Sequence, residues 1–210
     1  MDAAALKDQH RRVRDGQPEP LRVRIHRSIS WLTRAEHESD DPDARYIFLW
    51  IAASAGECGF DQAERQRVKR FSDKLLDRDS GNKLPQALLS PFSGPTRTLV
   101  ENKHVFEPFW RALREHDGSG AWEASFVSSK KVAMKALMGK ETGTLLSIVL
   151  DRLYVLRNQL VHGGATWGGK TNRAQVKDGV AILGTLVPIM LEVMMQAEDD
   201  EFEAIAYPVV

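Results

Sequence analysis

Residues 145–164 read LLSIVLDRLYVLRNQLVHGG, and this stretch decides the fold class. Its apolar residues recur at helical spacing and predict a mostly buried helix from Thr144 to Val161. Gly163 and Gly164 follow directly, and glycine is the usual residue just past a helix C-terminus. The apolar set consists of Leu145, Leu146, Ile148, Val149, Leu153, Leu156 and Leu160.

The segments on either side also have helical signals. Asn172 and Gln175 have the spacing of a capping box and predict a last helix that runs to about Gln196. Upstream, Asp41-Pro42-Asp43 has a capping residue, a proline suited to the first helical position and an acid in the first turn. No stretch alternates with period two, so we predict an all-α fold. Further helices are predicted from Leu21 onward and over 61–76, 86–89, 96–102, 108–116 and 128–138.

The composition limits the function classes. The 210 residues include 29 Lys+Arg and 29 Asp+Glu, so the formal net charge is zero and a globally basic nucleic-acid binder is excluded. Any RNA contact must therefore come from a local patch. The single cysteine, Cys58, excludes an internal disulfide and a thiolate zinc cage. The N-terminus lacks an apolar signal-peptide core, and the longest apolar run, Val180–Leu191, is too short to span a membrane. We therefore expect a cytoplasmic location and no membrane contact.

Three regions are predicted along the chain. Residues 1–20 are polar, contain Gly16 and two prolines, and are interpreted as a flexible N-terminal arm with an arginine cluster. Residues 21–197 are predicted to form one helical domain, in which 60–140 is the least distinctive part and supplies additional helices. Residues 198–210 are interpreted as an acidic C-terminal tail.

Two motifs suggest chemistry that their context does not support. Residues 164–171 match the phosphate-loop pattern G-x-x-x-x-G-K-[ST], but Arg157-Asn158-Gln159 do not suit the buried strand that must precede such a loop. We interpret these residues as an interhelical loop, with Lys170 beginning the next helix. Residues 36–43, EHESDDPD, resemble a metal-ligand cluster, but a helix end followed by a capped helix start explains them more simply. No metal or cofactor is expected.

The candidate site is the R-x4-H pair Arg157 and His162. A second pair, Arg111 and His116, lies on a charged amphipathic helix, whereas Arg157-Asn158-Gln159 interrupt the most apolar helix. Burying such polar groups costs free energy unless each finds a partner, which marks this helix as a candidate site. On an ideal helix Asn158 and His162 share a face with Asp151, and Arg157 points about 140° from His162. The alternative is a capping or core histidine at position 162.

Nearby residues are candidates for RNA binding. Lys170, Arg173 and Lys177 have i, i+3, i+7 spacing on the last helix, a stripe that fits an RNA backbone. Trp167, between two glycine pairs, is suited to stack on a base. The alternatives are a solvated helix face for the cations and a loop anchor for Trp167.

The segment from Leu145 to Met195 resembles the HEPN superfamily, whose signature is R-[polar]-x3-H at the end of a helix that another long helix follows. Arg157, Asn158 and His162 match this signature position by position. Further stretches resemble the Apea-like HEPN branch: HRSISWL at 26–32, DPDARYIFLW at 41–50, QVKDGVAIL at 175–183 and YPVV at 207–210.

This resemblance implies a HEPN-like helical bundle, paired as a homodimer, that cleaves RNA without metal. His162 would be the general base, or the acid from the partner chain, while Arg157 would stabilise the phosphorane and Asn158 would orient the site. The family also implies prokaryotic antiviral defence or a toxin–antitoxin system, with an antitoxin or another defence protein as partner. The alternatives are a catalytically inactive helical module that binds nucleotide or protein, and a small partner protein with no site.

Overall fold

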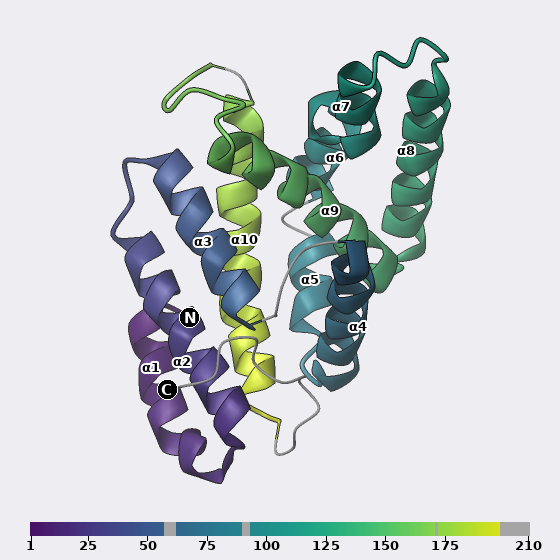
Figure 1. Cartoon of the computed structure of the whole chain (residues 1–210). Coiled ribbons are helices and arrows are strands. Elements are labelled where there is room, and N and C mark those ends of the chain that lie inside the picture. Colours follow the sequence, from purple (N-terminus) through teal and green to yellow (C-terminus); the bar gives the residue numbers. More distant parts are fainter. Residues whose placement is uncertain (57–61, 90–92, 171, 198–210) are drawn as a thin grey trace. The chain divides into compact units, whose positions relative to one another are not determined.

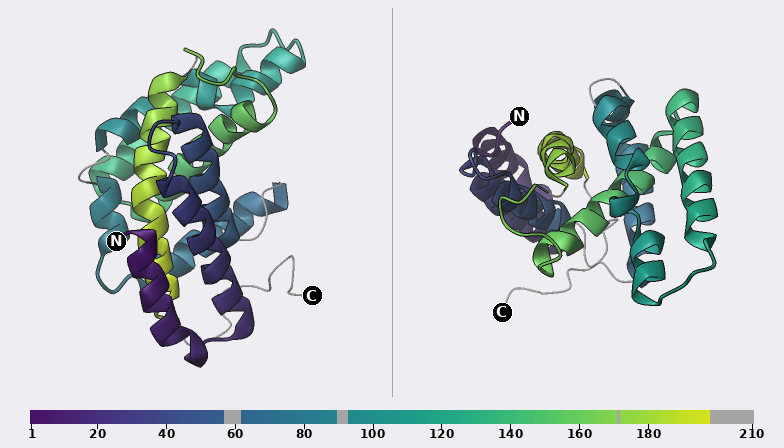
Figure 2. Two further views of the ribbon diagram at one scale, coloured as in Figure 1. Left: turned by 90° about the vertical axis from the view of Figure 1, so that its left-hand side faces the viewer. Right: turned by 90° about the horizontal axis from the view of Figure 1, so that it is seen from above.

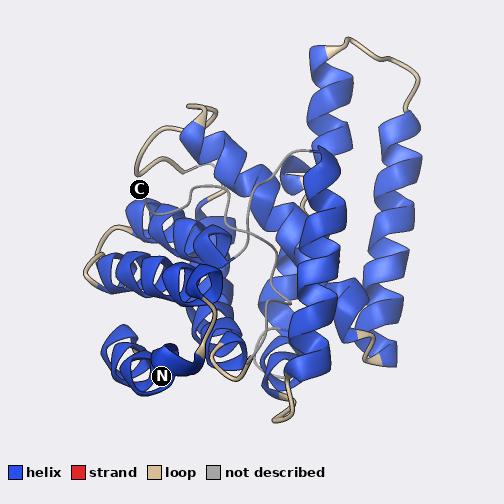
Figure 3. Cartoon of the chain, turned by 60° about the horizontal axis from the view of Figure 1, so that its bottom comes forward, coloured by secondary structure: helices blue, strands red, loops and turns tan. Residues whose placement is uncertain are grey.

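The computed structural model describes residues 1–56, 62–89, 93–170 and 172–197. In these ranges the chain forms ten α-helices and two short 3₁₀ helices and no strand (Figures 1 and 3). The predicted all-α class is therefore confirmed. None of the described helices combines the length and the apolar character needed to cross a bilayer. The predicted acidic tail, 198–210, lies outside the described residues.

The helices follow one another with short connections. Their bounds are α1 Ala3–Val13, η1 Arg14–Gly16, α2 Glu19–Glu36, α3 Pro42–Gly56, α4 Gln62–Arg78, α5 Lys83–Leu89, α6 Ser93–Glu101, η2 Lys103–Val105, α7 Glu107–Arg114, α8 Ala121–Gly139, α9 Thr142–Val161 and α10 Arg173–Met194.

The chain divides into two compact units. Unit 1 consists of residues 1–84 and 180–210, and unit 2 of residues 85–179. This division differs from the predicted single domain over 21–197 with additional helices over 60–140. Helix α10 contributes residues to both units.

Unit 1 is built around the helical pair α2 and α3, which lie side by side with part of α10 (Figures 1 and 2). Ile25, Leu32 and Leu49 are buried in this unit. Ser28 donates a hydrogen bond of 2.7 Å to the carbonyl oxygen of Ala52, which joins α2 to α3. A Cβ placed on Gly184 would lie 3.9 Å from Leu49, so α10 approaches α3 closely at this glycine.

The N-terminal segment corrects the prediction of a flexible arm. Residues 3–13 form helix α1, which packs against α2. Ala3, Leu6 and His10 share one helix face, and all three are buried. Asp2 accepts a 2.8 Å hydrogen bond from the backbone N–H of Ala5 and thereby caps the helix. The buried residues at positions 3, 6 and 10 thus hold α1 against α2, although the arginines and the following proline suggested a loose tail.

Unit 2 is organised around α9, against which α6, α8 and η2 pack. Leu145, Val149 and Leu153 are buried on this helix as the apolar pattern predicts. The same buried surface includes Arg152, which is only 1% exposed. Its Nη2 donates a 3.0 Å hydrogen bond to Ser129, and its guanidinium carbon lies 4.3 Å from the ring centre of Phe106.

Candidate functional site

The three predicted catalytic residues lie together at the C-terminal end of α9. Arg157 and Asn158 are half-buried, and Nη1 of Arg157 donates a 2.9 Å hydrogen bond to Oδ1 of Asn158. His162 occupies the C-cap position, and its backbone N–H donates to the carbonyl oxygen of Asn158 at 3.0 Å. Asn158 therefore contacts both partners of the predicted pair, through its side chain and its carbonyl group.

The imidazole of His162 is open to solvent. The residue is exposed. This contradicts the alternative of a core histidine at this position, whereas its backbone role at the helix end remains. Arg157 bonds to its neighbour Asn158 rather than to His162, from which it points about 140° away on an ideal helix. The hydrogen bond between Arg157 and Asn158 therefore does not bring Arg157 to the imidazole of His162.

Two glycines end the helix just past His162. Gly163 has a φ of +69°, the left-handed conformation that glycine adopts without steric cost. A Cβ at Gly164 would lie 3.3 Å from the carbonyl oxygen of Gln159, so the returning backbone passes close to the helix. The N–H of Ala165 donates to that same carbonyl oxygen at 3.2 Å. These glycines fix where α9 ends and hence where His162 stands.

Gln159, which the sequence analysis did not select, has the most far-reaching contacts of the polar run. Its Nε2 donates to the carbonyl oxygen of His104 in η2, 55 residues earlier in the chain. Its Oε1 accepts a hydrogen bond from Nδ2 of Asn172, immediately before α10. The glutamine thus joins α9, η2 and the start of α10, and these partners explain its place in an apolar helix. Only the packed structure brings His104 to this helix.

The predicted RNA-binding residues separate into two groups. Trp167 is 80% exposed, and Lys170 and Lys177 are exposed. Arg173 is half-buried, and its Nε donates a 3.1 Å hydrogen bond to the carbonyl oxygen of Gly169. Lys170 lies in the loop and α10 begins at Arg173, so the prediction that Lys170 starts the helix is wrong. The three cations therefore do not form one stripe along a single helix.

The glycine-rich stretch 164–170 is a loop between two helices. It follows α9, so no strand precedes it in the described residues, as the sequence argument against a phosphate loop requires. Gly168 has a φ of +65°, and the N–H of Gly169 donates to the carbonyl oxygen of Thr166 at 2.9 Å. The glycines therefore form a tight turn. Thr171 lies outside the described residues.

The competing Arg111 and His116 pair has a different setting. Arg111 belongs to α7, whereas His116 lies beyond the end of that helix with a φ of +51°. Both residues are exposed. The neighbouring Arg114 pairs with Glu107 at 2.6 Å on the same helix. The exposed pair Arg111 and His116 is therefore a suitable control for the half-buried Arg157 and Asn158.

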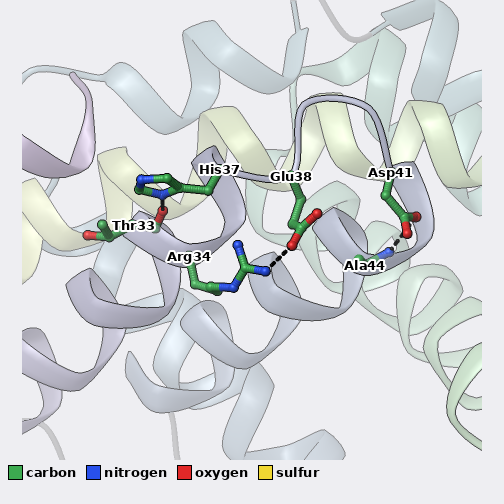
Figure 4. A network of polar contacts seen from close by, with 6 residues as sticks. All are labelled: Thr33, Arg34, His37, Glu38, Asp41 and Ala44. Atoms are coloured by element: carbon green, nitrogen blue, oxygen red, sulfur yellow. Dashed lines mark hydrogen bonds and ion pairs between the residues drawn. The ribbon is translucent and has the colours of Figure 1, made fainter.

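The acidic run at 36–43 contains the end of α2, the connection and the start of α3 (Figure 4). Nδ1 of His37 donates to the carbonyl oxygen of Thr33 at 2.7 Å, and Glu38 pairs with Arg34. Asp41 accepts 3.0 Å hydrogen bonds from the backbone N–H groups of Asp43 and Ala44 and so caps α3. The described residues contain no group of three or more His, Cys, Asp or Glu able to hold a metal ion.

The two units differ in charge although the whole chain is neutral. Residues 85–179 contain 13 lysines and arginines and 8 aspartates and glutamates, a formal charge of +5. The rest of the chain therefore has a formal charge of −5. Unit 2, which includes Arg157, Asn158 and His162, therefore has the excess of positive charge.

Comparison of the chain with protein-family models, with curated proteins and with solved structures gives no match.

Proposed function

We propose that this protein is a metal-independent endoribonuclease, with His162, Arg157 and Asn158 as its catalytic residues. The observation that carries the proposal is the exposed imidazole of His162, one turn beyond the hydrogen-bonded pair Arg157 and Asn158. The formal charge of +5 on unit 2 supports RNA as the substrate, because a phosphodiester backbone needs local positive charge.

The reaction is an internal transesterification. A base removes the proton from a ribose 2′-OH, the 2′ oxygen attacks the adjacent phosphorus, and the bond from phosphorus to the 5′ oxygen breaks as an acid protonates the leaving oxygen. The products are a 2′,3′-cyclic phosphate and a 5′-OH. His162 is the base, Arg157 neutralises the charge that develops on the phosphoryl oxygens, and Asn158 orients Arg157 through their hydrogen bond.

A homodimer completes this site. The reaction needs a base and an acid, and the end of α9 in one chain supplies a single imidazole. A twofold axis that places two α9 ends together would supply the second imidazole and the second guanidinium. Val161, next to His162, is 48% exposed and offers apolar surface for such a contact. In this proposal the enzyme acts in the cytoplasm, in antiviral defence or a toxin–antitoxin system in which a protein partner restrains it.

The test incubates the purified full-length chain with end-labelled RNA in EDTA. We expect cleavage to fall by at least about 10²-fold in His162→Ala and Arg157→Ala, as for loss of a general base or a charge-stabilising donor. His116→Ala should cleave like the wild type. The products should have 2′,3′-cyclic phosphate ends, and sedimentation should give a dimer. RNA that is bound but never cut would support the inactive module instead, and cleavage that survives His162→Ala would refute the proposed site.

A further inference from the structure

Unit 2 contains a group of aromatic rings and basic side chains that the catalytic proposal does not use. We call it the aromatic cluster; it comprises Phe106, Phe109, Trp110, Trp122 and Phe126 with Lys103, His104, Lys130 and Arg152. The rings fall into two contacting sets: Phe106 and Phe126 with centres 5.2 Å apart, and Phe109 with Trp110 and Trp122 at 5.2 and 5.0 Å. Trp110 and Trp122 are half-buried, so part of each indole faces solvent.

The lysines of this cluster lie over ring faces. Nζ of Lys103 is 5.3 Å from the ring centre of Phe109 and 5.9 Å from that of Trp122, and Nζ of Lys130 is 4.8 Å from that of Phe126. Within the described residues neither lysine forms an ion pair with a carboxylate. A cation–π contact attracts an ammonium group but leaves its charge unneutralised. These lysines therefore keep their full charge for an anionic ligand.

A second observation concerns the buried cation that lies over Phe106 and Phe126. Arg152 reaches the cluster from α9, and its Nε and Nη1 are buried without any hydrogen-bond partner. Buried guanidinium groups are normally paired, because leaving their donors unsatisfied is costly. Among the described residues Nη2 of Arg152 donates to the neutral Ser129, and the adjacent Asp151 carboxylate acts on it electrostatically. Two of the donors of this guanidinium, Nε and Nη1, are thus left without a hydrogen bond within the described residues.

The cluster is connected to the proposed catalytic residues. The carbonyl oxygen of His104 accepts hydrogen bonds from Nε1 of Trp110 and from Nε2 of Gln159. Gln159 follows Asn158 in α9 and precedes His162 by three residues. The contact fixes η2, with Lys103 and His104, against the catalytic end of α9 within one unit.

We propose that the aromatic cluster binds single-stranded RNA and guides it to His162, an inference that rests on the proposed nuclease function. Bases stack on the exposed parts of Trp110 and Trp122, and phosphates contact Lys103 and Lys130. Aromatic faces combined with unpaired cations are the chemistry by which proteins hold single strands. A duplex cannot use this surface in the same way, since its bases are already stacked on one another.

The experiment measures binding separately from cleavage, in a chain with His162→Ala. Fluorescence anisotropy of a labelled single-stranded RNA is recorded at several salt concentrations. Trp122→Leu should weaken binding about tenfold or more, as loss of one stacked base does. Lys103→Gln should lower the slope of log affinity against log salt by about 0.7, the value for one phosphate contact. The matched controls in unit 1, Trp31→Leu and Lys7→Gln, should change neither quantity.

Three results would overturn the inference: unchanged binding in both Trp122→Leu and Lys103→Gln, equal losses in the unit 1 controls, or duplex RNA bound as tightly as the single strand. Circular dichroism checks that each variant is folded, and Trp110→Leu replaces Trp122→Leu if the latter is not. The two proposals fail separately. If RNA binding depends on the cluster but the wild-type chain never cuts RNA, only the nuclease proposal is refuted. If RNA cleavage is the same in both cluster variants as in the wild type, only the proposed role of the cluster is refuted.

Discussion

Replacing Arg152 with methionine should stabilise the protein, which is an unusual expectation for the loss of a buried charge. Arg152 is 1% exposed, and burial lowers its pKa from the usual value for arginine to about 10. Since one pKa unit is worth about 1.4 kcal/mol, this lowering corresponds to about 3 kcal/mol of unfavourable free energy at neutral pH. Against this, the substitution removes one hydrogen bond to Ser129 and the contact with Phe106, each worth about 1 kcal/mol.

The net expectation for Arg152→Met is a gain of about 1 kcal/mol in the free energy of unfolding, since methionine fills similar space with no charge. A gain of this size raises Tm by roughly 2–4 °C in a chain of this length. The folded pKa lies below the unfolded one, so the penalty is constant at neutral pH and is relieved only as the pH rises through about 10.

Chemical denaturation and calorimetry of the full chain measure this effect. Arg97→Met, at an exposed position of α6, is the matched control and should change stability by less than about 0.5 kcal/mol. Arg152→Ala should destabilise the protein by about 2 kcal/mol or more, because it leaves a cavity beside Phe106. A loss of about 2 kcal/mol or more in Arg152→Met would refute the reasoning, because the guanidinium would then have strong partners.

Two further perturbations test contacts described above. Gln159→Leu should lower the free energy of unfolding by about 1–2 kcal/mol and speed amide exchange in η2, because it removes the hydrogen bonds to His104 and Asn172. Gln86→Leu, at an exposed site, is the control. Unchanged amide exchange in η2 would contradict the proposed link. Burial lowers the pKa of His10, and His26 and Arg14 lower it further by smaller amounts. The stability gained from a neutral His10 is therefore present above the unfolded pKa of 6.5 and is lost as the pH falls through the lower folded pKa. Between about pH 7 and pH 5, Tm should therefore fall less in His10→Leu than in the wild type. Equal falls in Tm would show that the docking of α1 does not depend on a neutral imidazole.

Much of the fold can be predicted because its signals are local. Asp41 caps α3 as its sequence context indicates, and Gly163 ends α9 in the left-handed conformation expected after a helix. The stripe of Ala3, Leu6 and His10 in α1 is also local, but the neighbouring arginines outweighed it in the interpretation of this segment. Helix α10 starts at Arg173, directly after Asn172, so the capping-box spacing located this start and the interpretation of Lys170 did not.

The candidate site is less predictable because its contacts join distant segments. The sequence places Arg157, Asn158 and His162 at the end of one helix, and the structure has them there. The roles of Gln159 and Arg152 depend on partners in η2 and α8 that no local pattern identifies. A buried arginine between Val149 and Leu153 does leave a trace in the sequence, since it lies on the apolar face of the helix. Its two donors without a hydrogen bond appear only once the packing is known.

The order of segments in unit 1 has a consequence for biosynthesis. Its α2 and α3 emerge early from the ribosome, whereas the part of α10 that belongs with them starts at Val180, after the 95 residues of unit 2. At translation rates of about 5–20 residues per second, this interval is roughly 5–20 s. During that time the part of α3 that packs against α10, with Leu49, is still exposed to solvent. Unit 2, made of one continuous stretch, can mature while the ribosome is still working.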